Sequence, residues 1–212
     1  MQIREFGDPS AEIVLIQMVD DHDLALIENE VKAIKENTSE PFRLIAVKVN
    51  DWNTDLSPWQ APAVFGKEDF RGGSVDTLRE VLKLCRDESK TYYIGGYSLS
   101  GLFALWAAYE TDVFKAVAAA SPSVWFPGFL EYTKGREILC DRVYLSLGDK
   151  EEKTRNQVMA RVGDNIREIY VLLKDKGIDC TLEWNEGNHF RDPDLRTAKA
   201  FSWVMKDHRD MR

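Results

Sequence analysis

Short apolar segments alternate with segments of helical periodicity along the whole sequence. The apolar segments resemble buried parallel strands in length and β-branched content, and they cover residues 12–19, 42–49, 92–97, 116–120, 142–147 and 180–184. Apolar residues recur at helical spacing in the intervening regions 24–34, 75–85, 99–109, 129–137, 159–173 and 195–206. Because parallel neighbours need a crossover connection, this alternation predicts an α/β fold, with a mainly parallel sheet of about six strands flanked by helices.

The length of the chain and its lack of divisions predict a single domain. The 212 residues suit one α/β domain. No linker or low-complexity segment divides the sequence, and no segment is long enough to form a separate lid. We therefore expect one domain over residues 1–212.

The net charge and the cysteine pattern restrict the binding partners that the chain is expected to have and the cellular compartment in which it is expected. The formal net charge of −8 argues against nucleic acid and against an anionic membrane surface, because both favour clustered lysine and arginine. The N-terminal segment MQIREFGDPSAEI lacks the basic and apolar regions of a signal peptide, and no apolar run approaches the length of a membrane span. Cys85, Cys140 and Cys180 lie far apart without CxxC spacing, which predicts reduced thiols and no zinc site. We expect a cytoplasmic protein.

The segment GGYSLSG, residues 95–101, joins a predicted strand to a predicted helix. A nucleophilic serine on such a turn has a strained backbone, and the residues two before and two after it must be small. Ser98 meets this condition, with Gly96 before it and Ser100 after it, although Ser100 replaces the second glycine of the G-x-S-x-G pattern. Around Ser100 itself, Leu102 would clash. The backbone N–H of Leu99 would then start a helix and could donate to an oxyanion.

A glycine-rich turn between strand and helix can also bind phosphate or pack tightly without any catalytic role. Neither G-x-x-x-x-G-K-[ST] nor G-x-G-x-x-G accompanies this turn, which weakens the phosphate interpretation.

A serine nucleophile needs a base, and the chain has three histidines. His189 follows the last predicted strand, on the same rim of the sheet as Ser98, and is the predicted base. His22 lies at the start of a predicted helix, where a surface or capping role is expected, and His208 lies in a charged C-terminal tail. The base needs a carboxylate to orient it. Several acids follow the fifth predicted strand in SLGDKEE, among them Asp149 and Glu151.

These segments together resemble the α/β-hydrolase superfamily. More narrowly, they are similar to the esterase family that includes esterase D-type and enterochelin (siderophore) esterase-type proteins. The resemblance rests on GYSLSGLFALWA, ASPSVWF, SLGDKE, GNHF and DWNTDLSPWQAPAVF, and it is taken to cover roughly residues 12–205, nearly the whole chain. The chain order of serine, acid and histidine agrees with that of the superfamily. Two departures are Ser100 in the turn and a single strand before the first helix, so the extra antiparallel strands of the superfamily are expected to be mostly absent.

The resemblance implies a serine hydrolase for small ester substrates that requires no metal and no organic cofactor. Ser98 would be the nucleophile and His189 the base. In this fold the acid often falls three residues after a glycine at the strand end, which favours Glu151 over the runner-up Asp149. The oxyanion hole would combine the Leu99 N–H with a backbone donor near Met18 or Val19. A non-catalytic or acyl-transferring relative that uses the same cleft for binding remains the alternative.

The longest connection without clear periodicity, residues 50–73, is expected to border the cleft. Long loops in compact domains are usually functional, and ligands bind beyond the carboxyl ends of parallel strands. Trp52 and Trp59 lie in this loop, and Trp125 lies in ASPSVWF. All three are candidates either to stack on a substrate or to pack the loops down. The other tryptophans, which are expected in the core, are Trp106, Trp184 and Trp203.

Overall fold

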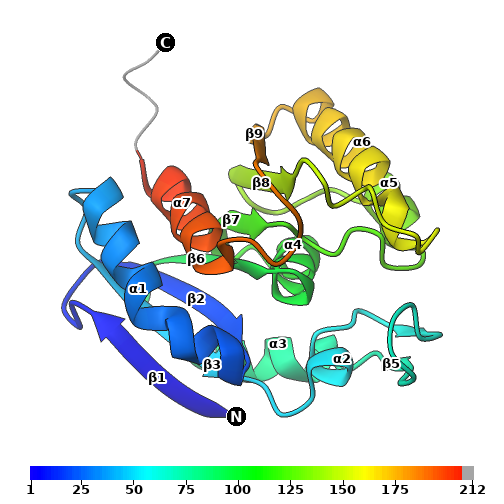
Figure 1. Cartoon of the computed structure of the whole chain (residues 1–212). Helices are drawn as coiled ribbons and strands as arrows, with labels where there is room; N and C mark the ends of the chain where they lie inside the picture. Colours follow the sequence, from blue (N-terminus) through cyan, green and yellow to red (C-terminus); the bar gives the residue numbers. More distant parts are fainter. Residues whose placement is uncertain (207–212) are drawn as a thin grey trace.

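A seven-stranded sheet forms the centre of the computed structural model, which describes residues 1–206 (Figure 1). His208 lies outside the described residues. The strands run in the order β1-β3-β2-β6-β7-β8-β9. The six that pair in parallel are β2 (Ile13–Val19), β3 (Phe42–Lys48), β6 (Thr91–Tyr97), β7 (Phe114–Ala120), β8 (Arg142–Gly148) and β9 (Asp179–Asn185). This arrangement confirms the mainly parallel α/β sheet expected from the sequence.

One strand, β1 (Gln2–Gly7), was not predicted, and the expectation of a single strand before the first helix was wrong. It pairs antiparallel with β3 at the edge of the sheet, with Phe6 opposite Leu44. Most of its residues are exposed, because an edge strand contacts the core with little of its surface. Its sequence QIREFG therefore carries no continuous apolar run that could mark a strand.

Helices cover both faces of the sheet (Figure 1). Two helices pack together on one face, α1 (Asp21–Asn37) and α7 (Pro193–Met205). Four lie on the other face, α3 (Ser74–Leu82), α4 (Leu99–Glu110), α5 (Phe129–Lys134) and α6 (Val162–Asp175), the last preceded by a short 3-10 turn, η1 (Met159–Arg161). Buried side chains alternate along the strands between these two layers, so each face has its own apolar core.

Small residues at the centre of the sheet allow the helices to approach it closely. Strand β7 contains the run AVAAA, and α4 is buried along nearly its whole length. A Cβ added at Gly95 would lie 2.7 Å from the Ala118 Cβ and 2.8 Å from the Phe201 ring. The strand that leads to Ser98 therefore accepts only a glycine at this point.

The loop over residues 50–73 has more structure than its sequence indicates. It contains α2 (Trp52–Asp55) and a two-stranded ribbon of β4 (Gln60–Ala61) and β5 (Phe70–Arg71). The Ser57 hydroxyl accepts a hydrogen bond from the Gly72 N–H, which ties the two halves of the loop together. The loop follows β3, so it stands at the carboxyl end of the sheet.

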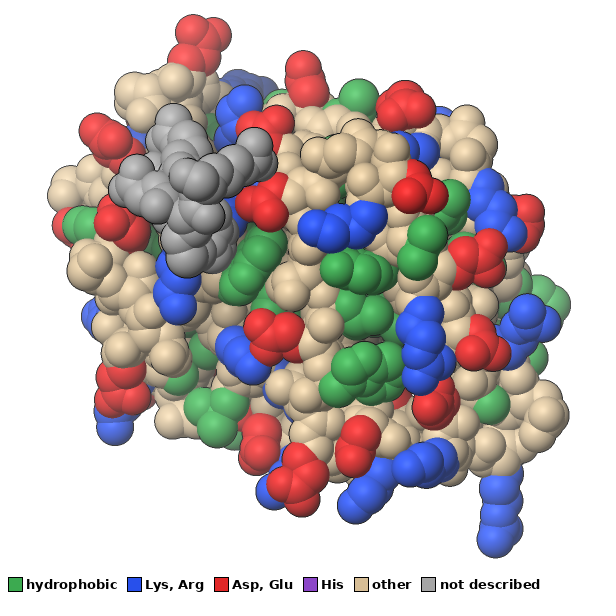
Figure 2. Space-filling model, turned by 90° about the horizontal axis from the view of Figure 1, so that it is seen from above, with side chains coloured by type: hydrophobic (Ala, Val, Ile, Leu, Met, Phe, Trp, Pro, Cys, Tyr) green, Lys and Arg blue, Asp and Glu red, His purple; other side chains and the backbone are tan. Residues whose placement is uncertain are grey.

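The expectation that Trp184 belongs to the core was wrong. Trp184 lies on the edge strand β9, where 42% of its surface is exposed and the Arg167 guanidinium covers its ring at 4.6 Å. Trp106 is buried, and Trp203 packs half-buried against the core. Seen from above, on the side where β9 and α6 lie uppermost in Figure 1, hydrophobic side chains gather in a small central group bordered by charged ones (Figure 2).

Candidate active site

Ser98 occupies a strained turn between β6 and α4. Its backbone has φ 58° and ψ −122°, a region that residues with a Cβ rarely adopt. The turn is tight, because a Cβ added at Gly96 would lie only 1.9 Å from the Ser100 Oγ. The Ser98 carbonyl accepts the first hydrogen bond of α4 from the Leu102 N–H. The result is a serine whose hydroxyl stands out from the carboxyl edge of the sheet.

Three side chains from three separate loops form a chain of hydrogen bonds. His189 Nε2 lies 3.0 Å from the Ser98 Oγ, and His189 Nδ1 lies 2.7 Å from the Glu151 Oε2. The loops follow β6, β8 and β9, whose carboxyl ends meet at the same edge. The Glu151 side chain is 3% exposed and that of His189 is 27% exposed, so the carboxylate is buried while the imidazole borders solvent.

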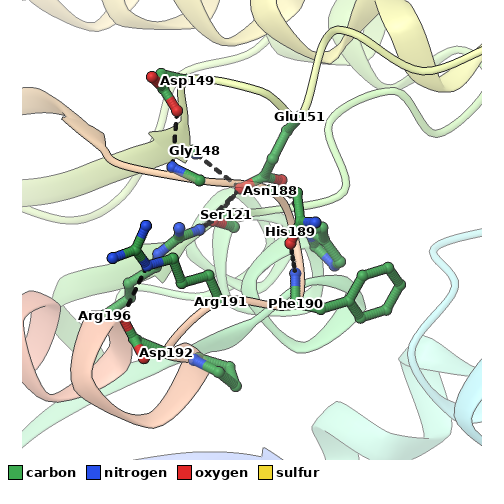
Figure 3. Close-up of polar contacts among 12 residues, drawn as sticks. Ser121, Gly148, Asp149, Glu151, Asn188, His189, Phe190, Arg191, Asp192 and Arg196 are labelled. Atoms are coloured by element: carbon green, nitrogen blue, oxygen red, sulfur yellow. Dashed lines mark hydrogen bonds and ion pairs between the residues drawn. The ribbon is translucent and has the colours of Figure 1, made fainter.

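The carboxylate of Glu151 is held in place by several donors (Figure 3). Its Oε1 accepts hydrogen bonds from the Gly148 N–H at 2.7 Å, the Ser121 hydroxyl at 2.7 Å and Arg196 Nη1 at 3.1 Å. All three donors bind the same oxygen, which leaves Oε2 for His189. The orientation of the carboxylate is therefore set by the fold before any substrate binds.

Asp149, the runner-up acid, does not contact His189. Its Oδ1 accepts a hydrogen bond from the Gly187 N–H at 2.7 Å, an arrangement that ties the loop after β8 to the loop after β9. The residue is exposed. The structure thus brings Glu151, and not Asp149, to the histidine.

Two residues that the sequence did not single out support the histidine loop. Arg196, on α7, is 4% exposed, and it also donates to the Tyr97 hydroxyl at 3.1 Å and to the Glu186 carbonyl at 3.0 Å. The Tyr97 hydroxyl donates to the His189 carbonyl at 2.8 Å. Burial, together with the charge of Glu151, raises the pKa of Tyr97 to about 12, so this phenol keeps its proton and remains a donor. Neither residue carried a local sequence signal, because each fits an ordinary strand or helix pattern.

The segment after β7 supplies two further serines. Ser121, with φ 42°, contacts Glu151 as described above. Ser123 Oγ lies 3.2 Å from the Ser98 Oγ, and its N–H donates to the Ser98 carbonyl at 3.0 Å. Both serines lie in ASPSVWF, a segment that carried the family resemblance without indicating a role for either hydroxyl.

The predicted oxyanion-hole residues lie beside the turn. Leu99 is the first residue of α4, and Met18 and Val19 are the last residues of β2. The Ser100 hydroxyl, fully buried, donates to the Met18 carbonyl at 2.8 Å and so joins the turn to the end of β2. The backbone N–H of the next residue, Asp20, is used in the capping box of α1. The assignment of Leu99, Met18 and Val19 to an oxyanion hole stays a prediction.

A cavity of about 260 Å³ opens beside His189. Its apolar wall is formed by Pro122, Trp125, Met159, Val162 and Phe190, of which Phe190 is 86% exposed. The cationic side chains at the cavity are Lys150 and Lys153. Neither ammonium group forms an ion pair within residues 1–206. The cavity thus combines an apolar wall with two unpaired positive charges.

The candidate tryptophans separate into two groups. Trp125 lines the cavity and packs against Phe65 and Phe70. Trp59 donates its indole N–H to the Pro127 carbonyl at 2.9 Å, and Trp52 packs half-buried against the core. Neither of these two lines the cavity.

His22 lies exposed in the first turn of α1, consistent with the expected surface role.

In the part of the chain that the structure describes, no three His, Cys, Asp or Glu side chains are grouped so that they could hold a metal ion. Among the same residues, no helix is both long and apolar enough to cross a bilayer.

The fold is shared with several hydrolases of known structure. No protein-family model matches the sequence, and no curated protein matches it significantly. A siderophore hydrolase, EstA from Aspergillus nidulans, is 21% identical with a TM-score of 0.68, over 94% of this chain and 86% of EstA. An IroE-like serine hydrolase from Shewanella oneidensis is 14% identical with a TM-score of 0.71, over 95% of this chain and 74% of that one.

A third similar structure is named as a transferase and not as a hydrolase. The capsule O-acetyltransferase of Neisseria meningitidis serogroup A is 12% identical with a TM-score of 0.57, over 97% of this chain and 91% of the other. At such identities the similarity shows the fold alone. The α/β-hydrolase fold that the sequence resemblance implied is therefore confirmed.

Proposed function

We propose that this protein is a serine hydrolase that cleaves carboxylic ester bonds of small substrates. The observation that carries the proposal is the continuous chain of hydrogen bonds from Ser98 through His189 to Glu151. A hydroxyl, an imidazole and a buried carboxylate in this order form the arrangement that activates serine for acyl transfer. The similar structures that are named as serine or siderophore hydrolases support the same reaction class.

Acylation follows from the direction of these hydrogen bonds. The Ser98 Oγ attacks the ester carbonyl carbon, the proton of the hydroxyl passes to His189 Nε2, and the carbonyl electron pair moves onto oxygen. Glu151 stabilises the resulting imidazolium and keeps Nδ1 protonated throughout. The Leu99 N–H and a backbone donor near Met18 or Val19 bind the tetrahedral oxyanion. His189 then donates its proton to the departing alcohol, and an acyl-enzyme on Ser98 remains.

Deacylation repeats the cycle with water. His189 removes a proton from the water as it attacks the acyl carbon, and returns that proton to the Ser98 Oγ when the acid leaves. No metal or organic cofactor takes part in the proposed cycle.

The cavity beside His189 indicates the kind of ester. Its volume of about 260 Å³ suits a small substrate, and the apolar wall suits an aliphatic or aromatic group. Lys150 and Lys153 favour a substrate that also carries a negative charge, because their ammonium groups are unpaired in residues 1–206. Siderophore-type esters are among the candidates, since one of the similar structures is named a siderophore hydrolase.

The alternative function is acyl transfer or binding in the same cleft. The fold similarity to a capsule O-acetyltransferase keeps acyl transfer open, because both reactions pass through an acylated or activated intermediate. The two differ in what receives the acyl group, water or an acceptor hydroxyl.

We further propose a cytoplasmic protein with one domain over residues 1–212 and no nucleic-acid or membrane partner.

Labelling with a fluorophosphonate, followed by peptide mapping with mass spectrometry, tests the proposal directly. This probe reacts with activated serines, so we expect an adduct on Ser98 that disappears in His189→Ala. Ser100→Ala is the matched control and should keep the adduct. A folded protein without any adduct on Ser98 would contradict the hydrolase and leave a binding role. Product analysis in water and with added alcohols then separates hydrolysis from transfer.

A further inference from the structure

Ser123 places a second hydroxyl against the proposed nucleophile. Its Oγ lies 3.2 Å from the Ser98 Oγ, and Ser123 is 1% exposed. Within the described residues, the Ser98 hydroxyl is the only partner that the Ser123 hydroxyl has. A buried hydroxyl is nearly always hydrogen-bonded, so this contact accounts for the polar group of Ser123.

The backbone holds Ser123 in this position. Its N–H donates to the Ser98 carbonyl at 3.0 Å, and its own carbonyl accepts from the Phe126 N–H at 2.9 Å. A Cβ added at Gly101 would lie 3.2 Å from Pro122, so the segment after β7 packs closely on the start of α4. The positions of the two residues relative to each other are therefore set by main-chain contacts.

The number of available protons decides which hydroxyl donates. The carboxylate of Glu151 can only accept, so the proton of a neutral His189 lies on Nδ1, and Nε2 carries a lone pair. Nε2 must then accept from the Ser98 hydroxyl, whose single proton is thereby used. The contact between the two serines still needs a proton, and only Ser123 can supply it.

We propose that Ser123 donates a hydrogen bond to the Ser98 Oγ and stabilises the partial negative charge that this atom carries while its proton moves to His189 and while it acts as the leaving group. This inference rests on the proposed hydrolase function. When the Oγ–carbon bond forms, the Ser98 proton moves to His189 Nε2 and the carbonyl electron pair moves to the substrate oxygen. The Ser123 proton stays on Ser123. In deacylation the Ser98 Oγ is the leaving group, and the same donor stabilises it as the bond to the acyl carbon breaks. A donor that is already in place needs no reorganisation at the moment of reaction.

A graded series of variants tests the donor role. Serine, cysteine and alanine at this position offer a strong donor, a weak donor and no donor, and none of the three has more heavy atoms than serine. We expect the rate constant for fluorophosphonate labelling of Ser98, measured per folded molecule, to fall by about 10- to 100-fold in Ser123→Ala, with Ser123→Cys in between. Hydrolysis of p-nitrophenyl acetate should show the same order in kcat, with KM changed by less than about twofold.

Ser202→Ala is the matched control, because Ser202 is also a buried serine but donates to the Ala198 carbonyl within α7. It should leave the labelling rate unchanged. Thermal unfolding of each variant separates a loss of folded protein from a loss of reactivity. If the wild type is labelled at Ser98 and Ser123→Ala is labelled at the same rate, the proposed role of Ser123 is overturned while the hydrolase proposal stands. A wild-type protein that is never labelled at Ser98 would overturn both this role and the proposed function.

Discussion

Arg196 and Glu151 form a buried ion pair that connects the last helix to the loop after β8. Arg196 Nη1 lies 3.1 Å from the Glu151 Oε1, and the two side chains are 5% and 3% exposed. A buried ion pair is stable only when further hydrogen bonds offset the loss of hydration. Here the Gly148 N–H and the Ser121 hydroxyl complete the shell of Glu151, and the Glu186 carbonyl binds Arg196. The pair therefore orients the carboxylate that contacts His189.

Removal of the arginine should lower the stability of the fold. Arg196→Met leaves a buried carboxylate without its cation, so we expect the free energy of unfolding to fall by about 3–5 kcal/mol. Denaturation in urea measures this change. Arg191→Met is the control, because Arg191 pairs with Glu186 at the surface and should contribute at most about 1 kcal/mol. Equal effects of the two substitutions would show that the buried pair is not a main contributor to stability.

The two acids after β8 should differ sharply in their effect on turnover. Glu151→Gln keeps the size of the side chain but removes the charge that stabilises the imidazolium, so we expect kcat to fall by about 10⁴-fold. In Asp149→Asn the side-chain oxygen still accepts from the Gly187 N–H, and kcat should change by less than about threefold. Steady-state hydrolysis of p-nitrophenyl acetate compares the two. A larger loss in Asp149→Asn would reassign the acid.

Ser100 should contribute to the stability of the fold and not to catalysis. Its hydroxyl donates to the Met18 carbonyl in a fully buried position, so Ser100→Ala should lower the free energy of unfolding by about 1 kcal/mol. The Ser98 hydroxyl and His189 are untouched by this change, and most of the activity should remain. Unfolding and ester hydrolysis are measured on the same preparation. Near-complete loss of hydrolysis by a folded variant would count against Ser98 as the nucleophile.

The lysines at the cavity should select for charged esters. In Lys150→Glu with Lys153→Glu, we expect KM for the mono-p-nitrophenyl ester of a dicarboxylic acid to rise by about tenfold, because attraction becomes repulsion. KM for neutral p-nitrophenyl acetate should stay within about twofold. Lys32→Glu with Lys35→Glu, on the exposed surface of α1, controls for the same change in net charge. The prediction fails if both esters respond alike.

The free energy of unfolding should fall as the pH rises because of two acids in α1, Asp23 and Glu30. Burial raises the pKa of Glu30 well above its usual value, and burial with the neighbouring charge of Asp20 raises that of Asp23 to about 6. A folded-state pKa above the unfolded value means that folding takes up a proton. The stabilisation is thus complete below about pH 4, where the unfolded chain titrates, and is lost as the pH rises through 6 and above.

Glu30→Gln tests this pH dependence. Gln17 Nε2 donates to the Glu30 Oε2 at 3.2 Å, and it can donate equally to an amide oxygen. Because the neutral side chain needs no proton uptake, the variant should be more stable than the wild type at pH 8 by about 1–3 kcal/mol and similar to it at pH 4. Urea midpoints at both pH values provide the comparison. A variant that is less stable than the wild type at pH 8 would show that the charged carboxylate is favourable there.

The sequence by itself determined the order of strands and helices and the edge of the sheet that carries the site. Largely buried parallel strands have continuous apolar runs, so β2, β3, β6, β7 and β8 were recognisable, whereas the exposed edge strand β1 has no such run. Trp184 was misplaced for a related reason, because a strand pattern does not show whether the strand lies at the centre or at the edge of the sheet. Ser98 was recognisable because its tight turn needs small neighbours at fixed spacing.

Only the tertiary structure decided which side chains meet at that edge. Asp149 and Glu151 lie two residues apart in one loop. Glu151 is oriented by donors from β8, the segment after β7, and α7, whereas Asp149 accepts from the loop after β9. Arg196 and Ser123 have no local sequence signal, because each acts on a residue at least 25 positions away. Periodicity reports how one segment contacts its surroundings, whereas a site made of several loops depends on distances between segments that folding alone brings together.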